Sequence, residues 1–218
     1  MKNRKLISAI VPVYNEEKTV SKVIDTLLKN NLIDEVICVN DGSTDTSMEM
    51  LNLFKEKIKI INLQKNFGKG YALSVGIKRA KGEVVAFIDA DLTNLSDDHI
   101  RELLTPIINN DTRGVVGYLS SAKGEFDLLF SNLTGERAYY KKDLISHVEE
   151  MAKTRFGVEI FLNRLFDKKD IQKVPLKNLK GLLKHEKRKP SNTLIEYYIE
   201  GVEIMKELIR STRLVKID

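Results

Sequence analysis

Tryptophan is absent from this 218-residue sequence, and cysteine occurs only once. A single cysteine cannot form an internal disulfide, so Cys38, inside the apolar run 35–40, is expected to be a buried thiol in a reducing cytosol. No apolar run approaches the roughly 20 residues that cross a membrane, and the run at 6–13 is too short even though basic residues precede it. We therefore expect no transmembrane helix, no signal peptide and a cytoplasmic location.

Acidic residues are fewer than basic ones, 31 against 36, which gives a formal net charge of +5. This excess is compatible with nucleic acid, an anionic membrane surface or phosphorylated small molecules as partners. The basic residues are spread along the chain, and their one concentration, at 177–189, contains little aromatic sequence. We therefore expect no nucleic-acid partner, and phosphorylated ligands or lipid headgroups remain as candidates.

Short apolar runs alternate with amphipathic segments through the first half of the chain. Strands are predicted at 6–13, 35–40, 58–63, 83–88 and 114–119. Helices are predicted after Glu17 and at about 45–57, 69–81 and 96–109, the last kinked or ended by Pro106. This alternation predicts an α/β fold with a doubly wound, mostly parallel sheet flanked by helices.

A polar or glycine-containing block follows each of the first four predicted strands. The blocks are PVYNE (12–16), NDGSTD (40–45), NFGKG (66–70) and DAD (89–91). Sheets of this kind bind ligands beyond the carboxyl ends of their strands, so the four blocks predict a site at one edge of the sheet.

Asp89 and Asp91 form the most informative of these blocks. Residues two apart in an extended chain point to the same side, so the two carboxylates can converge on a hard cation such as Mg²⁺ or Mn²⁺ shared with a diphosphate. An acidic pair at a strand end is also typical of a solvated turn or a helix cap. Lys69, beside two glycines, suits an approach to phosphate, although the P-loop pattern is absent.

The four blocks, in this order and at these separations, resemble the nucleotide-sugar-binding half of family 2 glycosyltransferases with the GT-A fold. The resemblance is close over 6–91 and weaker afterwards. It implies metal-dependent transfer of a sugar from a nucleotide diphosphate sugar, with UDP- and GDP-sugars as first choices. The donor is implied to contact Pro12, Tyr14, Glu16, Asp41, Lys69 and Ala90, and the metal to bind Asp89 and Asp91, Asp91 also being catalytic. From the residues alone, Glu16 is equally typical of a helix N-terminus and Asp41 of a glycine-containing turn.

The resemblance extends to an acceptor side. The block GERAYY (135–140) is similar to one in members that transfer to phosphate-bearing acceptors, which implies that Arg137 clamps an anion; the alternative is a surface arginine paired with an acid. Glu159 is implied as a base or a sugar-hydroxyl contact, and its alternative is a helix N-terminal glutamate. Thr93 replaces the glutamine usual in polyprenyl-phosphate transferases, which favours a soluble acceptor such as phosphoglycerate while leaving polyprenyl phosphate open.

The resemblance also implies that His185 completes the metal shell, against the simpler interpretation of a surface histidine in a lysine-rich turn. The predicted organisation is a nucleotide-sugar half at 1–119, an acceptor half of the same domain at 120–190 and a C-terminal amphipathic helix at 191–218. We expect a loop over the site at 120–134. The helix would pack on the domain, form a homodimer or dock on the inner face of a membrane.

Two other functions remain open at this stage. FIDADLT also matches the nucleophile block of haloacid dehalogenase-like phosphatases, in which Asp89 would attack phosphorus. Against this, the block follows the fourth predicted strand, and no later paired-acid motif was found. A protein that binds nucleotide sugar without turnover is the second alternative.

Overall fold

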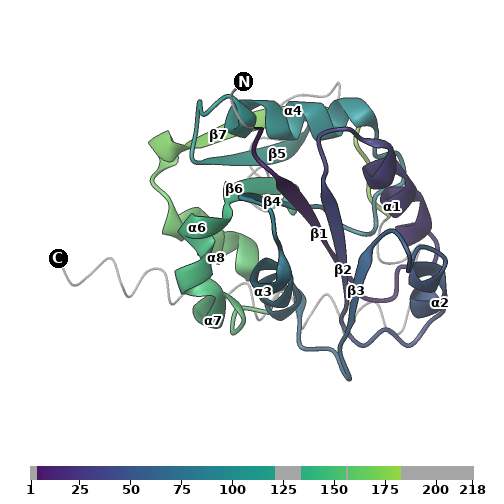
Figure 1. Ribbon diagram of the computed structural model, residues 1–218. Helices are drawn as coiled ribbons and strands as arrows, with labels where there is room; N and C mark the ends of the chain where they lie inside the picture. Colours follow the sequence, from purple (N-terminus) through teal and green to yellow (C-terminus); the bar gives the residue numbers. More distant parts are fainter. Residues whose placement is uncertain (1–3, 121–133, 156, 183–218) are drawn as a thin grey trace.

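The computed structural model describes residues 4–120, 134–155 and 157–182. Its centre is one seven-stranded sheet with the order β3-β2-β1-β4-β6-β5-β7 (Figure 1). The strands are β1 (Ile7–Val13), β2 (Glu35–Asn40), β3 (Lys59–Asn62), β4 (Val84–Phe87), β5 (Gly114–Ser120), β6 (Arg137–Tyr140) and β7 (Ile171–Lys177). His185, the C-terminal helix and nearly all of the predicted loop at 120–134 lie outside the described residues.

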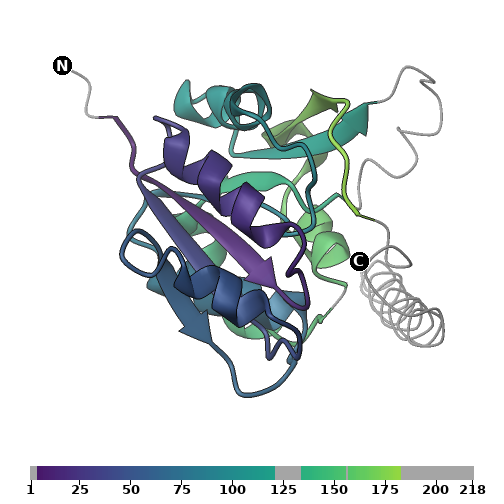
Figure 2. The same ribbon diagram turned by 90° about the vertical axis from the view of Figure 1, so that its right-hand side faces the viewer.

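Helices cover both faces of the sheet (Figures 1 and 2). They are α1 (Val20–Lys29), α2 (Ser47–Asn52), α3 (Lys69–Arg79), α4 (Asp97–Ile108), α6 (Lys141–Leu144), α7 (Val148–Met151) and α8 (Val158–Leu165). The apolar sides of α1, α2 and α4 pack on one face, and those of α3, α6, α7 and α8 pack on the other. The predicted α/β fold with a mostly parallel sheet is confirmed.

The predicted elements differ from the structure mainly in length. The second helix spans 47–52 instead of 45–57, and Leu53 just beyond it is 72% exposed. Phe54 and Ile58 still pack on the core, but residues 53–57 form turns instead of continuing the helix. Pro106 lies inside α4, which continues to Ile108, so the helix ends within a turn of the proline as predicted.

β6 is a strand that the sequence pattern did not reveal. It runs antiparallel to both of its neighbours, β4 and β5, whereas the other pairs in the sheet are parallel. Arg137 pairs with Phe87, so the beginning of β6 lies beside the end of β4. Continuing this register places Gly135 opposite Asp89.

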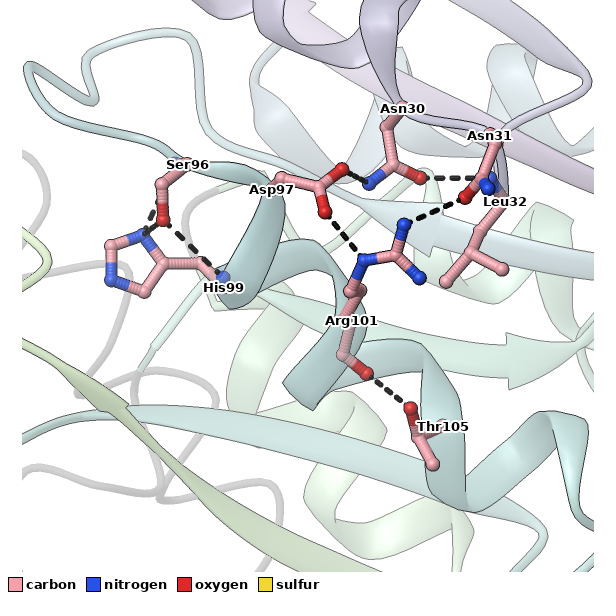
Figure 3. Close-up of polar contacts among 8 residues, drawn as sticks. All are labelled: Asn30, Asn31, Leu32, Ser96, Asp97, His99, Arg101 and Thr105. Carbon is pink, nitrogen blue, oxygen red and sulfur yellow. Dashed lines mark hydrogen bonds and ion pairs between the residues drawn. The ribbon is translucent and has the colours of Figure 1, made fainter.

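Side-chain hydrogen bonds attach α4 to the turn after α1 (Figure 3). Asp97 accepts from the Asn30 amide at 2.5 Å and pairs with Arg101, which also donates to Asn31 at 3.0 Å. His99 completes a capping box with Ser96, and its Nε2 lies 2.9 Å from a backbone carbonyl, which can only accept. This histidine therefore has a structural role, and α4 is fixed on the face of the sheet opposite α3.

Within the part of the chain that the structure describes, every helix is too short or too polar to cross a bilayer.

Candidate active site

The loops after β1 and β2 are hydrogen-bonded to each other at the carboxyl edge of the sheet. Asn15 has a left-handed backbone conformation with φ 58°. Its side-chain Oδ1 accepts from Thr44 N at 2.7 Å, and its backbone N–H donates to Ser43 Oγ at 3.0 Å. The Glu16 amide donates to Ser47 Oγ at 2.7 Å. These bonds hold the first two predicted blocks side by side.

Asp41 fastens the third block to the second. Its carboxylate is buried and accepts from the backbone amides of Phe67 and Gly68, both at 2.8 Å. Burial raises the pKa of this carboxyl, although the two amides and the nearby Arg155 guanidinium lower it. Gly68 has φ 96°, a conformation that favours glycine. Asp41 therefore has a structural task, and its contact with a nucleoside stays a prediction.

Lys69 joins two carboxylates from different elements. Its Nζ lies 2.7 Å from Asp89 Oδ1, just after β4, and 2.9 Å from Glu159 Oε1, in the first turn of α8. Burial alone would lower the pKa of the ammonium, but the charges of Asp89 and Glu159 outweigh it and raise the pKa. The structure thus brings three predicted site residues together. Lys69 binds two carboxylates, whereas the sequence suggested that it would approach a phosphate group.

Glu136 is a fourth titratable residue at this point, and the sequence reasoning missed it. Its side chain is 4% exposed. Burial and the charge of Asp89 raise the pKa of its carboxyl to about 8, with Lys69 opposing and Asp91 adding to the shift. Burial beside Asp89 therefore favours the protonated form of Glu136. Its position beside Arg137 in the acceptor-side block was the only signal in the sequence.

Asp91 is held by the chain that follows β7. The Leu182 amide donates to the Asp91 carbonyl at 2.9 Å, and the Thr93 amide donates to the Lys180 carbonyl at 2.8 Å. Thr93 Oγ1 also donates to Lys180 O at 3.1 Å. The described chain therefore reaches Leu182 beside the acidic pair, three residues before His185.

Arg137 has a position unlike that of a surface arginine. It is 1% exposed, and its guanidinium donates to Thr134 O, Tyr139 Oη and Asn163 Oδ1. The surface-arginine alternative is therefore wrong. The role of Arg137 as an anion clamp stays a prediction, and the hydrogen bonds described here all lie inside the protein.

The remaining predicted donor contacts lie on the same edge. Pro12 is near the end of β1, where it pairs with Val39 of β2, and Tyr14 follows it, partly buried. The Glu16 carbonyl accepts from Thr19 and Val20 at the start of α1, so Glu16 also has the helix-terminal position of its alternative. Ala90, between the two aspartates, is buried in the core.

No group of three or more histidine, cysteine, aspartate or glutamate side chains in the described ranges is arranged to hold a metal ion. Asp89 and Asp91 nevertheless offer carboxylate oxygens, the ligands that Mg²⁺ and Mn²⁺ prefer. Both aspartates also raise the pKa of Glu136, so both carboxylates lie within electrostatic range of it. This donor set fits a divalent ion that takes its other ligands from elsewhere, phosphate oxygens included.

The known proteins that this chain resembles are glycosyltransferases. The sequence profile of glycosyl transferase family 2 matches residues 8–187. A dolichyl-phosphate beta-glucosyltransferase of Trichomonas vaginalis is 30% identical over 175 residues, covering 71% of this chain and 53% of that protein. An uncharacterized glycosyltransferase of Synechocystis sp. is 41% identical over 93 residues, covering 39% of this chain and 29% of the relative. The chain thus spans about half, or less, of the length of these relatives.

The fold resembles that of solved structures with a GT-A domain. Glucosyl-3-phosphoglycerate synthase from Mycobacterium tuberculosis, in complex with Mn²⁺, UDP and glucosyl-3-phosphoglycerate, superposes with a TM-score of 0.73 at 23% identity. The match covers 94% of this chain and 79% of that one. Because the profile that matches is one of sugar transferases, the phosphatase interpretation of Asp89 is abandoned.

Proposed function

Because the chain belongs to glycosyltransferase family 2, we propose that it transfers a sugar from a nucleotide diphosphate sugar to a phosphorylated acceptor. The observation that carries this proposal is the cluster of Asp89, Lys69 and Glu159 at the carboxyl edge of the sheet. In open α/β sheets this edge is where ligands bind. The cluster combines a carboxylate for a cation, Asp89, with a carboxylate that can act on a hydroxyl group, Glu159.

A divalent cation, Mg²⁺ or Mn²⁺, would be held by Asp89 and Asp91. When bound, such an ion neutralises the charge that develops on a departing diphosphate. His185 remains our proposed further ligand. The backbone hydrogen bonds at Asp91 and Thr93 support this assignment, because they place Leu182 beside the acidic pair. His185 is only three residues further along the chain, a length that spans at most about 11 Å when extended. Glycosyltransferase structures of similar fold contain Mn²⁺, which supports a divalent ion here.

The chain's own residues have distinct tasks in this proposal. Lys69 neutralises part of the negative charge that Asp89 and Glu159 bring together. Glu159, held at 2.9 Å by Lys69, would accept a proton or a hydrogen bond from a sugar or acceptor hydroxyl. The raised pKa of Glu136 favours its neutral form, which limits the negative charge gathered beside Asp89.

The nucleoside would lie over the loops after β1 and β2. Tyr14 and Pro12 offer surface for a base or ribose, and Glu16 and Asp41 offer carboxylate oxygens that accept from their N–H or O–H groups. Asp41 already receives two backbone amides, and each of its oxygens has a second lone pair. UDP is our first choice, because neighbouring structures contain UDP or UDP-glucose.

The acceptor is proposed to be phosphorylated. Neighbouring structures contain phosphoglyceric acid or glycerol 3-phosphate. Two relatives are named as glucosyltransferases acting on dolichyl phosphate and poly(ribitol phosphate). The proposal therefore includes both a small phosphorylated acid and a polyprenyl phosphate.

The decisive experiment combines binding and turnover on the full chain. Thermal shift with UDP-, GDP-, ADP- and dTDP-sugars in Mn²⁺ identifies the donor, since a ligand at 100 times its Kd adds about 2.7 kcal/mol of stability. Sugar transfer to phosphoglycerate and to polyprenyl phosphate is then measured by mass spectrometry. We expect Asp91→Asn to abolish transfer and Asp98→Asn, an exposed acid of α4, to preserve it.

Three results would contradict the proposal. Full activity of Asp91→Asn, or of the wild type in EDTA, would remove the metal assignment. Donor binding without transfer to any acceptor would favour a binding protein instead.

A further inference from the structure

Arg137 is among the largest side chains that are fully buried in the described chain. A guanidinium keeps its charge at any physiological pH, and its burial requires acceptors for its N–H groups. Its three acceptors come from the chain just before β6, from β6 itself and from α8. Nε donates to the Thr134 carbonyl at 2.8 Å, and Nη1 donates to Asn163 Oδ1 at 2.8 Å and to the Tyr139 hydroxyl at 3.2 Å.

The bond to Thr134 acts on the backbone that contacts Asp89. Thr134 directly precedes Gly135, which the register of β4 and β6 places opposite Asp89. The approach is so close that a Cβ on Gly135 would lie 2.1 Å from Asp89 Oδ2. Arg137 therefore holds the chain just before β6 against the first carboxylate of the acidic pair.

The bond to Asn163 acts on the helix that carries Glu159. The two residues are four apart in α8, so they lie on the same face of the helix, one turn from each other. Glu159 contacts Lys69 from this face, and Asn163 contacts Arg137. The rotation of α8 about its axis is thus fixed at two points one turn apart.

We propose that Arg137 is a positioning residue for the reaction. It joins the backbone beside Asp89 to the helix that carries Glu159, and so sets the separation of the two carboxylates that Lys69 bridges. The catalytic consequence rests on the proposed function, whereas the mechanical link does not. Reacting groups must be held within a fraction of an ångström of their working geometry, so loosening this link lowers turnover more than it lowers acceptor binding.

Steady-state kinetics on four variants tests the link. We expect Arg137→Met to lower kcat by about tenfold or more, while the KM for the acceptor stays within about twofold. Arg137→Lys, which keeps the charge but not the planar fork, should recover part of kcat. Asn163→Ala should lower kcat by less, and the double variant Arg137→Met/Asn163→Ala should be no slower than Arg137→Met, because both changes remove one contact.

Hydrogen exchange of the amides in 158–165 provides a readout that needs no activity. Exchange should accelerate in Arg137→Met and in Asn163→Ala. It should not change in Arg101→Met, which removes an arginine with similar side-chain bonds from α4 on the opposite face of the sheet (Figure 3). If Arg137→Met fails to fold, Arg137→Lys and Asn163→Ala carry the same comparison, because Asn163 is an exposed position.

The outcomes separate the two proposals. Two results together would overturn the positioning role in favour of an anion clamp. Arg137→Met would raise the acceptor KM strongly while keeping kcat, and its effect would add to that of Asn163→Ala. Unchanged exchange and kcat in an active enzyme would also overturn it. A wild type that transfers no sugar, together with the expected exchange pattern, would refute the proposed function and leave the link between Arg137 and α8 supported.

Discussion

Lys69 and Asp89 form an ion pair, with 2.7 Å between Nζ and Oδ1, at the point where α3 begins and β4 has just ended. A divalent cation on Asp89 would share this carboxylate with the ammonium. The two cations would repel each other, so Lys69 should weaken metal binding while no diphosphate is present to add negative charge.

Removing this ammonium should therefore separate metal affinity from turnover. We expect Lys69→Gln to bind Mn²⁺ more tightly than the wild type without nucleotide, and to lose about tenfold or more in kcat. Calorimetry measures the first effect and transfer kinetics the second. Lys78→Gln, at the exposed end of the same helix, is the matched control. Weaker Mn²⁺ binding in Lys69→Gln would show that the ammonium organises the site for the metal.

Glu136 should make stability depend on pH. The folded pKa of about 8 lies above the ordinary value of 4.5, so between these values the folded state holds a proton that the unfolded state has lost. The free energy of unfolding should then fall as pH rises through this window, by up to about 1.4 kcal/mol per unit. Glu136→Gln should remove this contribution, and Glu49→Gln, an exposed acid of α2, should keep it.

Urea unfolding at pH 5, 6, 7 and 8 in the presence of a chelator measures this dependence. Identical slopes of stability against pH in the wild type and in Glu136→Gln would mean that Glu136 is not the protonated group.

Gly135 should tolerate no side chain, because a Cβ would lie 2.1 Å from Asp89 Oδ2. We expect Gly135→Ala to displace the Asp89 carboxylate and to reduce metal-dependent transfer by about a hundredfold. Gly181→Ala provides the comparison beside the other aspartate, where the nearest atom, Asp91 Oδ1, is 3.3 Å away. That variant should retain most of its activity. Equal activities would disprove the tight contact between Gly135 and Asp89.

Asp41 should affect both stability and nucleotide binding. Asp41→Ala removes two charge-assisted hydrogen bonds to the loop at 66–70, each worth about 1.5–3 kcal/mol, so the thermal midpoint should fall without any ligand. If Asp41 also contacts the base, Asp41→Asn should weaken nucleoside diphosphate binding. The loss of binding free energy should then exceed the loss in the free energy of unfolding. Asp111→Asn, an exposed acid after α4, serves as the control. Unchanged nucleotide affinity in both Asp41 variants would leave the residue a purely structural role.

Local sequence patterns were sufficient to predict β1–β5, α1, α3, α4 and the four polar blocks at one edge of the sheet. These features depend on periodicity and on residues close together in the chain, so they can be inferred without knowing the neighbours. β6 could not be predicted, because a four-residue strand takes its position from partners about fifty residues before it and about twenty before it, at Phe87 and Val116.

The missed features of the site follow from that strand. Glu136 and Arg137 are buried because β6 lies between β4 and β5, and the sequence alone places both in a charged, apparently exposed block. Lys69 was assigned to phosphate for a similar reason. Its partner Glu159 lies ninety residues later, on a helix whose position beside Lys69 no local pattern encodes.

The insertion of β6 between β4 and β5 also has a consequence for the newborn chain. On a ribosome, β4 is made long before β6, so it remains an open edge of the sheet, with unpaired N–H and C=O groups, until Arg137–Tyr140 has been synthesised. β5 emerges earlier than the strand that must separate it from β4, and direct pairing of the two would give a misfolded sheet. Because sheets with such late, long-range pairing fold slowly and expose aggregation-prone edges, a fragment that stops at residue 119 should depend on chaperones far more than the complete domain does.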